Sequence, residues 1–446
     1  MSLTLKGLTG LVLLLGVTAD GAVAQTPASV WELTALQQPV RHLVAGSAGA
    51  LFATTDTQLF RSDDSGDTWR VVALPADNAV AAVDPSNQQI LYAAAGQLLY
   101  RTDDGGTTWH AAGQYTPDDS LQVSRLVVSP ADPSLLYVAL AQLPGRAAEG
   151  RLLRSRDRGA TWQQLQAVQQ SLCAWSVLLL QPHPTDPGRV FSAAACLAGR
   201  TFGATLQQSS DAGTTWTAIF NPQPYATPEL GYPTELVGGQ NRFYLAANRD
   251  ARLGGSGVFR SDDDGVSWTS VLTLRGGGTS GFRAPEDDPN APNIRIGGLA
   301  ADANDADRVY AGQLIYDRYP PSEPVAGGVL VSRDAGATWD TLGCQDLGGV
   351  NALALGIDGR YLFAATAQGV SRLIIAVAGE AAADCEVTPP SAGIAAPDST
   401  EPVPAAGVEP ASSLYESAAL TVELGGLTGA RAKVYREDRP GLREDG

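Results

Sequence analysis

Six aspartates recur in one short motif, and carboxylates at a repeated spacing could serve as calcium ligands or as catalytic acids. The motif reads Ser/Thr-x-Asp-x-Gly-x-Thr/Ser-Trp, and its aspartates are Asp64, Asp104, Asp157, Asp211, Asp263 and Asp334. Each copy offers few oxygens compared with a dedicated calcium loop. The Asp side chain can instead accept hydrogen bonds within its own turn, where the glycine supplies a positive φ. We therefore expect these aspartates to be structural, and we expect no metal and no cofactor.

An apolar run precedes nearly every motif and a short β-favouring segment follows it. In the first copy these are Leu59-Phe60-Arg61, in which Arg61 is expected to point outward, and Arg70–Leu74. A turn rich in Asp and Gly between two such runs predicts a β-hairpin. Two further apolar runs, joined by a Pro/Asp-rich corner, complete each unit. Four short antiparallel strands per unit, without helical periodicity, predict an all-β chain folded as a β-propeller.

A seventh unit, Val350–Ile375, lacks both the motif and a fourth strand. The segment Val30–Leu36 resembles that missing last strand. We therefore expect residues 25–376 to form a seven-bladed β-propeller of four-stranded antiparallel blades, closed by the N-terminal strand. Closure of the ring removes the open sheet edges that a linear array would leave.

The two ends of the chain differ from the repeats in composition. Residues 1–24 contain Lys6, an apolar centre and the small residues Ala22-Val23-Ala24, a pattern typical of a cleaved secretory signal peptide. The alternative is an uncleaved membrane anchor. Residues 377–446, rich in Ala, Pro, Glu and Ser, predict a disordered, flexible tail. We expect a secreted or extracytoplasmic monomer with no membrane span after signal cleavage.

Charge narrows the range of partners. The 446 residues carry a formal net charge of −17, which argues against nucleic acid or an anionic membrane surface as the partner. The three histidines, His42, His110 and His183, are scattered along the chain, so a zinc site built on imidazoles is not expected.

Four cysteines lie in or just beyond the repeats. A hairpin turning about Pro184-Thr185 would place Cys173 opposite Cys196, and export favours oxidation, so we predict a disulfide between them. The second predicted disulfide joins Cys344 to Cys385. The alternative is four free buried thiols.

The six motifs resemble the Asp-box, or bacterial neuraminidase (BNR), repeat of sialidases, the sortilin ectodomain, xyloglucan-degrading propellers and photosystem II stability/assembly factors. The resemblance covers about residues 30–375 and implies Asp boxes on the face opposite the ligand site. The tetrapeptide Phe282-Arg283-Ala284-Pro285 matches the Arg-x-Pro motif of sialidases locally. It lies between the fifth and sixth boxes, however, and a turn held by Pro explains it equally. Xyloglucanase relatives place their acids between two propellers, whereas this chain has one.

Long links are concentrated in units three to six. Links between second and third strands open on the same face as the blade-to-blade links, and the long ones are Gln142–Gly150, Leu197–Ala204, Asn248–Gly257 and Gln313–Gly328. Long loops on a rigid scaffold often carry function, although neutral insertion would leave the same pattern. Tyr and Arg most often anchor interfaces, so the candidate binding residues near these links are Tyr232, Arg249, Arg252, Arg283, Tyr316, Arg318 and Tyr319.

Two functions fit these features. The first is an exported, non-catalytic propeller that binds a protein or glycan ligand through the loop-rich face of blades 3–6. The second is a sialidase-like or other glycoside hydrolase acting on extracellular glycans. An acid pair with one raised pKa, close to an arginine cluster at that face, would favour the hydrolase.

Overall fold

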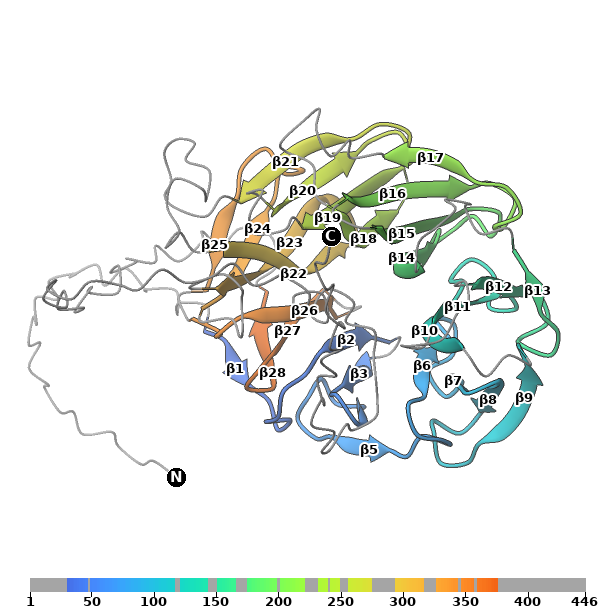
Figure 1. Cartoon of the computed structure of the whole chain (residues 1–446). Helices are drawn as coiled ribbons and strands as arrows, with labels where there is room; N and C mark the ends of the chain where they lie inside the picture. The colour runs from blue at the N-terminus through green and yellow to red at the C-terminus, as the bar shows by residue number, and fades with distance from the viewer. Residues whose placement is uncertain are drawn as a thin grey trace, which may run out of the picture.

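Seven antiparallel sheets of four strands each are arranged in a ring (Figure 1). The computed structural model describes residues 30–46, 49–116, 121–142, 151–165, 175–198, 201–220, 232–239, 241–248, 256–274, 293–316, 326–343, 346–356 and 359–375. The all-β, seven-bladed prediction is therefore confirmed. Residues 1–24 and the tail 377–446 lie outside the described residues.

Each blade takes four strands, and the first of them lies nearest the ring axis (Figure 1). Blades 1 and 2 comprise β2 (His42–Ala45), β3 (Leu51–Thr54), β4 (Leu59–Ser62) and β5 (Arg70–Val72), then β6 (Val80–Val83), β7 (Leu91–Ala95), β8 (Leu98–Thr102) and β9 (His110–Gln114). Blades 3 and 4 comprise β10 (Leu121–Val128), β11 (Leu136–Gln142), β12 (Arg151–Ser155) and β13 (Gln163–Gln164), then β14 (Trp175–Pro182), β15 (Val190–Ala198), β16 (Thr201–Ser209) and β17 (Thr217–Phe220).

The remaining blades follow the same order. Blades 5 and 6 comprise β18 (Tyr232–Gly239), β19 (Arg242–Asn248), β20 (Ser256–Ser261) and β21 (Thr269–Leu274), then β22 (Asn293–Asp302), β23 (Asp305–Tyr316), β24 (Val329–Ser332) and β25 (Asp340–Leu342). Blade 7 comprises β26 (Val350–Leu355), β27 (Tyr361–Thr366), β28 (Val370–Ile374) and, as its outermost strand, β1 (Glu32–Leu33).

The N-terminal strand closes the ring, as predicted. Glu32 pairs with Arg372 and Leu33 with Ser371, and the Thr34 amide continues the ladder by donating to the Val370 carbonyl at 2.8 Å. The Trp31 indole donates to the Leu342 carbonyl of blade 6 at 3.2 Å. This closure covers the edge of β28, which would otherwise be left unpaired in a three-stranded blade.

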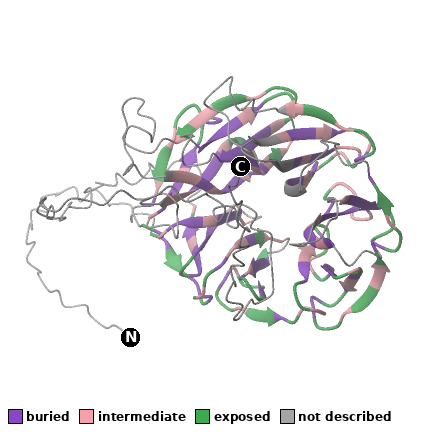
Figure 2. Cartoon of the chain, viewed as in Figure 1, coloured by how far each residue is buried: buried purple, intermediate pink, exposed green. Residues whose placement is uncertain are grey.

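A layer of buried aromatic side chains explains why the blades pack into a ring. Each second strand carries a buried aromatic residue, which in blades 1–6 comes directly after the residue that pairs with the third strand's last position. All are at most 3% exposed: Phe52, Tyr92, Tyr137, Phe191, Tyr244, Tyr310 and Phe363. Large rings buried between neighbouring sheets supply much of the apolar contact that holds the blades together. Figure 2 shows exposed residues gathered on the outer strands.

The first strands of blades 3–6 are longer than those of blades 1 and 2. Strands β10, β14 and β18 have 8 residues each and β22 has 10, against 4 in β2 and β6. The registers of the second strands show that the extra residues are at the start of each strand. We call these starts, namely 121–124, 175–178, 232–234 and 293–297, the extended rim. The rim rises on the face where the second-to-third strand links open.

One predicted long link is a strand pair instead. The segment Leu197–Ala204 was expected to be a loop, but β15 and β16 stay paired up to Ala198 and Thr201. Continued pairing satisfies backbone N–H and C=O groups that a loop would leave to water. The additional residues of blade 4 therefore lengthen the hairpin above the ring.

Candidate functional site

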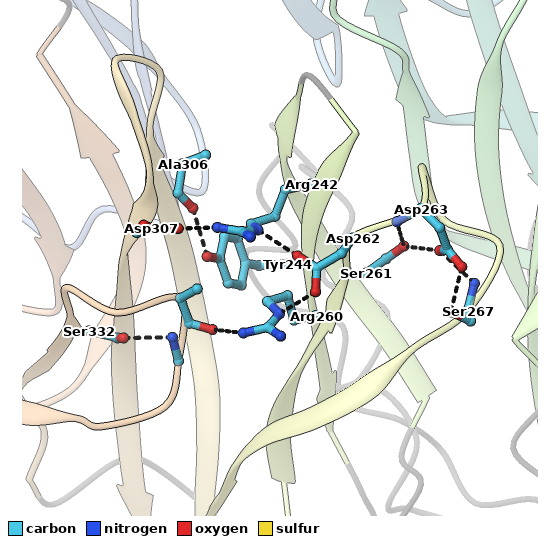
Figure 3. Close-up of polar contacts among 12 residues, drawn as sticks. Arg242, Tyr244, Arg260, Ser261, Asp262, Asp263, Ser267, Ala306, Asp307 and Ser332 are labelled. Carbon is cyan, nitrogen blue, oxygen red and sulfur yellow. Dashed lines mark hydrogen bonds and ion pairs between the residues drawn. The ribbon is translucent and has the colours of Figure 1, made fainter.

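Each Asp-box aspartate hydrogen-bonds within its own turn. The Asp64 Oδ1 atom accepts from the Ser62 hydroxyl and from the Thr68 amide, both at 2.8 Å, and Oδ2 accepts from the Thr68 hydroxyl at 2.6 Å. The other five aspartates make the same three contacts. Figure 3 shows these contacts for Asp263 with Ser261 and Ser267. The pKa of Asp263 is lowered to about 2, and the hydrogen bond from the Ser267 hydroxyl is the largest cause.

These contacts use the carboxylate oxygens that a metal would need. Within the described ranges, no group of three or more His, Cys, Asp or Glu side chains is placed to hold a metal ion. The boxes join third to fourth strands, so strand alternation puts them on the face opposite the extended rim. The box face and the rim face therefore lie at opposite ends of the ring axis.

Three of the arginines directly before the boxes, Arg61, Arg154 and Arg260, reach into the next blade and do not point outward. Arg61 is 2% exposed and Arg154 is 5% exposed. The Arg154 Nη1 atom donates to the Ala212 carbonyl of blade 4 at 2.6 Å, and Arg260 donates to the Ala335 carbonyl of blade 6 at 2.7 Å. At the ring closure Arg372 donates to the Ser65 carbonyl at 3.1 Å. The outward orientation predicted for this position was wrong, because a buried carbonyl of the neighbouring box needs a donor.

The accepting carbonyls belong to box residues with positive φ. Ser65, Ala212 and Ala335 have φ of 58°, 59° and 60°, the left-handed region that a tight turn before glycine requires. This backbone conformation directs the carbonyl toward the preceding blade. A hydrogen bond from an arginine in that blade then joins two blades through their turns.

The seam between blades 5 and 6 shows the same arrangement with more charge (Figure 3). Arg242 forms ion pairs with Asp262 of its own blade and with Asp307 of blade 6. The Tyr244 hydroxyl donates to the Ala306 carbonyl at 2.8 Å. Arg260 bridges Asp262 and the Ala335 carbonyl. Polar contacts therefore hold this seam at its box end.

A buried histidine holds the seam between blades 4 and 5. His183 is 5% exposed, and its Nε2 atom lies 3.1 Å from Asp264 Oδ1, while Asp264 Oδ2 pairs with Arg189. Its Nδ1 atom accepts from the amides of Thr185 and Asp186 at 3.2 and 3.1 Å. Nδ1 must therefore be unprotonated. Burial lowers the pKa of His183 below 6.5, and the Arg189 charge lowers it further.

Two of the predicted binding residues have described backbones on the rim face. Tyr232 opens β18 and pairs with Asn248, and Tyr316 ends β23 and pairs with Asn293. Both therefore stand at the rim ends of their strands. The other five candidates lie outside the described residues: Arg249, Arg252, Arg283, Arg318 and Tyr319.

The cysteine hairpin turns later than expected. The ladder pairs Pro182 with Val190, so the turn centres near Asp186 and not at Pro184-Thr185. A bulge at residue 178 shifts the register again, and Trp175 pairs with Cys196. The direct opposition expected for Cys173 was therefore wrong. Cys173, Cys344 and Cys385 lie outside the described residues, so both disulfides remain predictions.

A second set of residues, which the repeats do not reveal in the sequence, shares one level around the ring axis. In every blade, one residue of the first strand pairs with the second-strand residue two positions after the buried aromatic. We call this set the axial layer: His42, Val80, Arg125, Leu179, Glu235, Gly298 and Ala352. Polar side chains occupy it in the alternate blades 1, 3 and 5.

A β-bulge precedes the axial layer in blades 3–7. In blade 3 the bulged Ser124 donates its hydroxyl to the Ala139 carbonyl at 3.1 Å, and in blade 5 Thr234 does the same to Ala246 at 3.3 Å. The extra residue bends a strand and re-aims the side chain after it. Arg125 and Glu235 are the side chains that follow these two bulges.

Glu235 connects blade 5 to blade 6 close to the axis. Its Oε2 atom accepts from the Leu299 amide of β22 at 2.6 Å. Burial raises the pKa of Glu235 to about 8, although the Leu299 hydrogen bond favours the charged form. At neutral pH the carboxyl is therefore mostly protonated, and it can donate as well as accept a hydrogen bond.

His42 and Arg125 provide the other polar groups of the layer. Burial lowers the pKa of His42 to about 4, and the positive charges of Arg125 and Arg41 contribute. The Arg125 Nη1 atom donates to the Ser124 carbonyl at 3.1 Å. Val44, two residues after His42 on the same side of β2, is 52% exposed. Water therefore reaches the inner side of blade 1, although protein atoms surround His42 itself closely.

The fold and the repeated turn define a class of protein, a seven-bladed β-propeller with Asp boxes on one face. Residues 57–193 match the family model described as Sortilin, neurotensin receptor 3 (Sortilin-Vps10). The chain has the fold and the repeated turn of an Asp-box β-propeller, and the family-model match covers less than half of it. No curated protein matches the chain.

Solved structures with the same fold have low sequence identity to this chain. The GH74 xyloglucanase from Xanthomonas campestris is 19% identical with a TM-score of 0.53, over 77% of this chain and 53% of that one. A GH74 enzyme from Niastella koreensis is 16% identical with a TM-score of 0.53, over 76% and 53%. The extracellular domain of a putative hybrid two component system from B. thetaiotaomicron is 12% identical with a TM-score of 0.50, over 78% and 40%. The chain thus spans about half the length of the GH74 structures.

In the part of the chain that the structure describes, no helix has the length and apolar character needed to cross a bilayer.

Proposed function

We propose that this chain is an exported, non-catalytic β-propeller that binds a protein or glycan ligand through the rim face of blades 3–6. The observation that carries the proposal is the extended rim, because four consecutive blades have first strands of 8 to 10 residues where blades 1 and 2 have 4. Rigid paired strands present their groups in fixed positions, which lowers the entropy cost of binding.

The distribution of structural and polar groups supports the same face. The six boxes and the cross-blade arginines occupy the opposite face, where their polar atoms bond one another. The rim face has Tyr232 and Tyr316 at strand ends and the polar members of the axial layer below them. Export follows from the signal sequence predicted in residues 1–24 and agrees with the extracellular placement of one structural relative.

A glycan hydrolase is the second candidate, and Glu235 is the observation that favours it. A carboxyl whose pKa is raised to about 8 is suited to donate a proton to a leaving group. Glycoside hydrolysis also needs a second carboxylate nearby. In the axial layer, whose seven members are all described, Glu235 is the one acidic residue. We therefore place binding ahead of catalysis.

A glycan array and a panel of fluorogenic glycosides test the two candidates together. Binding without turnover supports the first, and turnover that is lost in Glu235→Gln supports the second. Replacing Tyr316, Arg318 and Tyr319 with Ala should weaken binding at least tenfold and leave the melting temperature within about 2 °C, since surface changes alter stability little.

The matched control lies on the other face. Asp157→Ala removes the carboxylate that accepts from Ser155 and Thr161, so it should lower the melting temperature and leave the dissociation constant unchanged. If Asp157→Ala weakened binding and the triple variant did not, the ligand would bind the box face and the proposal would be wrong.

A further inference from the structure

The corner between β14 and β15, residues 183–189, is held by a histidine where equivalent corners have other residues. In blades 2, 3 and 4 the first corner residue donates its amide to the carbonyl of the last one at 3.0 Å; these first residues are Asp84, Ser129 and His183. The Asp84 carboxylate and the Ser129 hydroxyl also accept an amide of their own corner, at 2.9 and 3.4 Å. His183 Nδ1 accepts two, from Thr185 and Asp186, at 3.2 and 3.1 Å. Of these three acceptor types, imidazole is the one whose ordinary pKa lies between pH 5 and 8.

The contacts of His183 fix where its proton lies. Since Nδ1 accepts two N–H groups, the proton of the neutral ring is on Nε2, which donates to Asp264 Oδ1 at 3.1 Å. A second proton has to bind Nδ1, where it would face the two amide donors. The imidazolium therefore requires these amides to move away. Its Nε2–H can still donate to Asp264, because that contact does not change on protonation.

Several charged side chains lie on the elements packed against this imidazole. They are Asp186 and Arg189 of the same corner, Asp262, Asp263 and Asp264 of the fifth box, and Arg242 at the start of β19. Arg242 pairs with Asp262, and Asp263 accepts hydrogen bonds within its own turn. Asp264 thus contacts the imidazole directly, and its other oxygen pairs with Arg189. The rings of Phe191 and Phe243 cover the imidazole, with centroids at 6.4 and 5.4 Å.

The same corner connects blade 4 to both of its neighbours. The Gly188 carbonyl accepts from the Ala212 amide of the fourth box at 2.6 Å. The Ala212 carbonyl in turn accepts from Arg154 of blade 3 at 2.6 Å. On the other side, Arg189 pairs with Asp264 of blade 5. A change in the corner therefore reaches the hydrogen bond that joins blade 3 to the fourth box.

We propose that His183 is an acid-sensitive switch: protonation of Nδ1 opens the corner and frees the fourth box from it, while the contact with Asp264 holds blade 5 in place. The proton comes from solvent, and the amides of Thr185 and Asp186 then donate to water instead of to Nδ1. The corner carries proline at positions 184 and 187, so few other backbone donors hold it closed. This inference concerns the box face and does not depend on the proposed ligand binding at the rim face.

The direction and size of the effect follow from proton linkage. Burial and the Arg189 charge lower the pKa of His183 below its ordinary 6.5 while the corner is closed. The open corner therefore takes up the proton first, so the closed state is fully favoured above about pH 6.5 and is lost progressively below it. If the closed corner takes up no proton at pH 5, the equilibrium constant for opening is about 30-fold larger at pH 5 than at pH 7.5.

Hydrogen exchange of the full chain at pH 7.5 and pH 5, corrected for the intrinsic effect of pH on exchange, measures this opening. We expect protection of the corner amides to fall by up to about 30-fold at pH 5, and protection of the Ala212 amide to fall with it. The Ser129 corner of blade 3 is the internal control and should not respond, because a hydroxyl does not titrate in this range. The Asp264 amide, which donates to the Asn241 carbonyl at 3.0 Å, should stay protected.

His183→Asn and His110→Asn form a matched pair. The asparagine side chain at position 183 has an oxygen to accept the corner amides and an N–H to donate to Asp264, but it takes up no proton in this range. His183→Asn should therefore lose the acid response. His110 is exposed on β9, so His110→Asn should keep the response of the wild-type chain. If His183→Asn does not fold, the contrast between the His183 and Ser129 corners in the wild-type chain still decides.

Four results would overturn the proposal. The first is a change of less than about twofold in the protection of the corner between the two pH values. The second is an equal response of the Ser129 corner, which would indicate a general effect of acid. The third is an unchanged response in His183→Asn, which would assign the effect to carboxylates. The fourth is loss of protection at Asp264 together with the corner, which would mean that blades 4 and 5 separate. No ligand enters these measurements, so failure of the proposed binding function would leave this inference intact.

Discussion

Replacing Arg154 with Met should lower the free energy of unfolding by about 2–3 kcal/mol. Arg154 is 5% exposed, and it donates from Nη1 to the Ala212 carbonyl at 2.6 Å and from Nη2 to Gln163 Oε1 at 2.7 Å. A hydrogen bond with one charged partner contributes about 1.5–3 kcal/mol, so two give about 3–6 kcal/mol. Burial of the guanidinium, which lowers the pKa of Arg154, offsets part of this gain. Methionine retains the apolar stem and leaves the Ala212 carbonyl without its donor.

Urea unfolding followed by tryptophan fluorescence measures the change, since Trp216 belongs to the box that contains Ala212. The matched control is Arg333→Met, because the Arg333 side chain is 41% exposed and pairs with an exposed Asp340. Exposed pairs contribute at most about 1 kcal/mol, so the control should shift stability by less than about 0.5 kcal/mol. Equal shifts for the two variants would refute the view that buried arginines join the blades.

Deleting Gln25–Leu36 should remove β1, expose the edge of β28 and cause aggregation, which light scattering and a melting curve would detect; a monomer with unchanged melting temperature would contradict the closure. Acid should destabilise the chain, because the folded pKa of His183 is lowered. The unfolded state then takes up the proton first, so stability present above about pH 6.5 is lost as the pH falls below it. Urea midpoints at pH 7.5 and pH 5 should differ less in His183→Asn than in the wild-type chain. Non-reducing peptide mapping should find Cys173 joined to Cys196, and free thiol at Cys173 in oxidised, exported protein would exclude that disulfide.

The repeated turn made the architecture predictable from the sequence. A motif that fixes a hairpin also fixes the strands on either side, so six copies specify most of a ring. The orphan segment Val30–Leu36 was recognisable because Trp31 stands where the box tryptophan stands in other blades. Its indole donates to the Leu342 carbonyl, as Trp339 donates to the Val271 carbonyl. The sequence pattern of this segment and the need to close the ring predicted the same strand, and its pairing with β28 confirms it.

The axial layer was not predictable, for a physical reason. His42, Arg125 and Glu235 are equivalent through cross-strand register, but the corners and bulges between each of them and its box differ in length from blade to blade. No fixed spacing along the chain links them, so a scan for motifs sees one histidine, one arginine and one glutamate. The altered pKa values of His42 and Glu235 come from burial by several blades, which no short stretch of sequence records.

The arginines before the boxes were only partly predictable from the sequence. Their recurrence at Arg61, Arg101, Arg154 and Arg260 was visible, but their direction was misjudged, because a charged residue at the end of an apolar run usually faces water. Val331 shows why the direction matters. It holds the same position in blade 6, and the next blade, blade 7, has no box and therefore no turn carbonyl of this kind to accept a hydrogen bond. Arg154 and Arg260 thus donate to a turn carbonyl of the following blade, and in blade 4 Gln208 holds the position and donates to the Asp264 carbonyl of blade 5. The cross-blade contacts of these arginines therefore belong to the box face, opposite the extended rim.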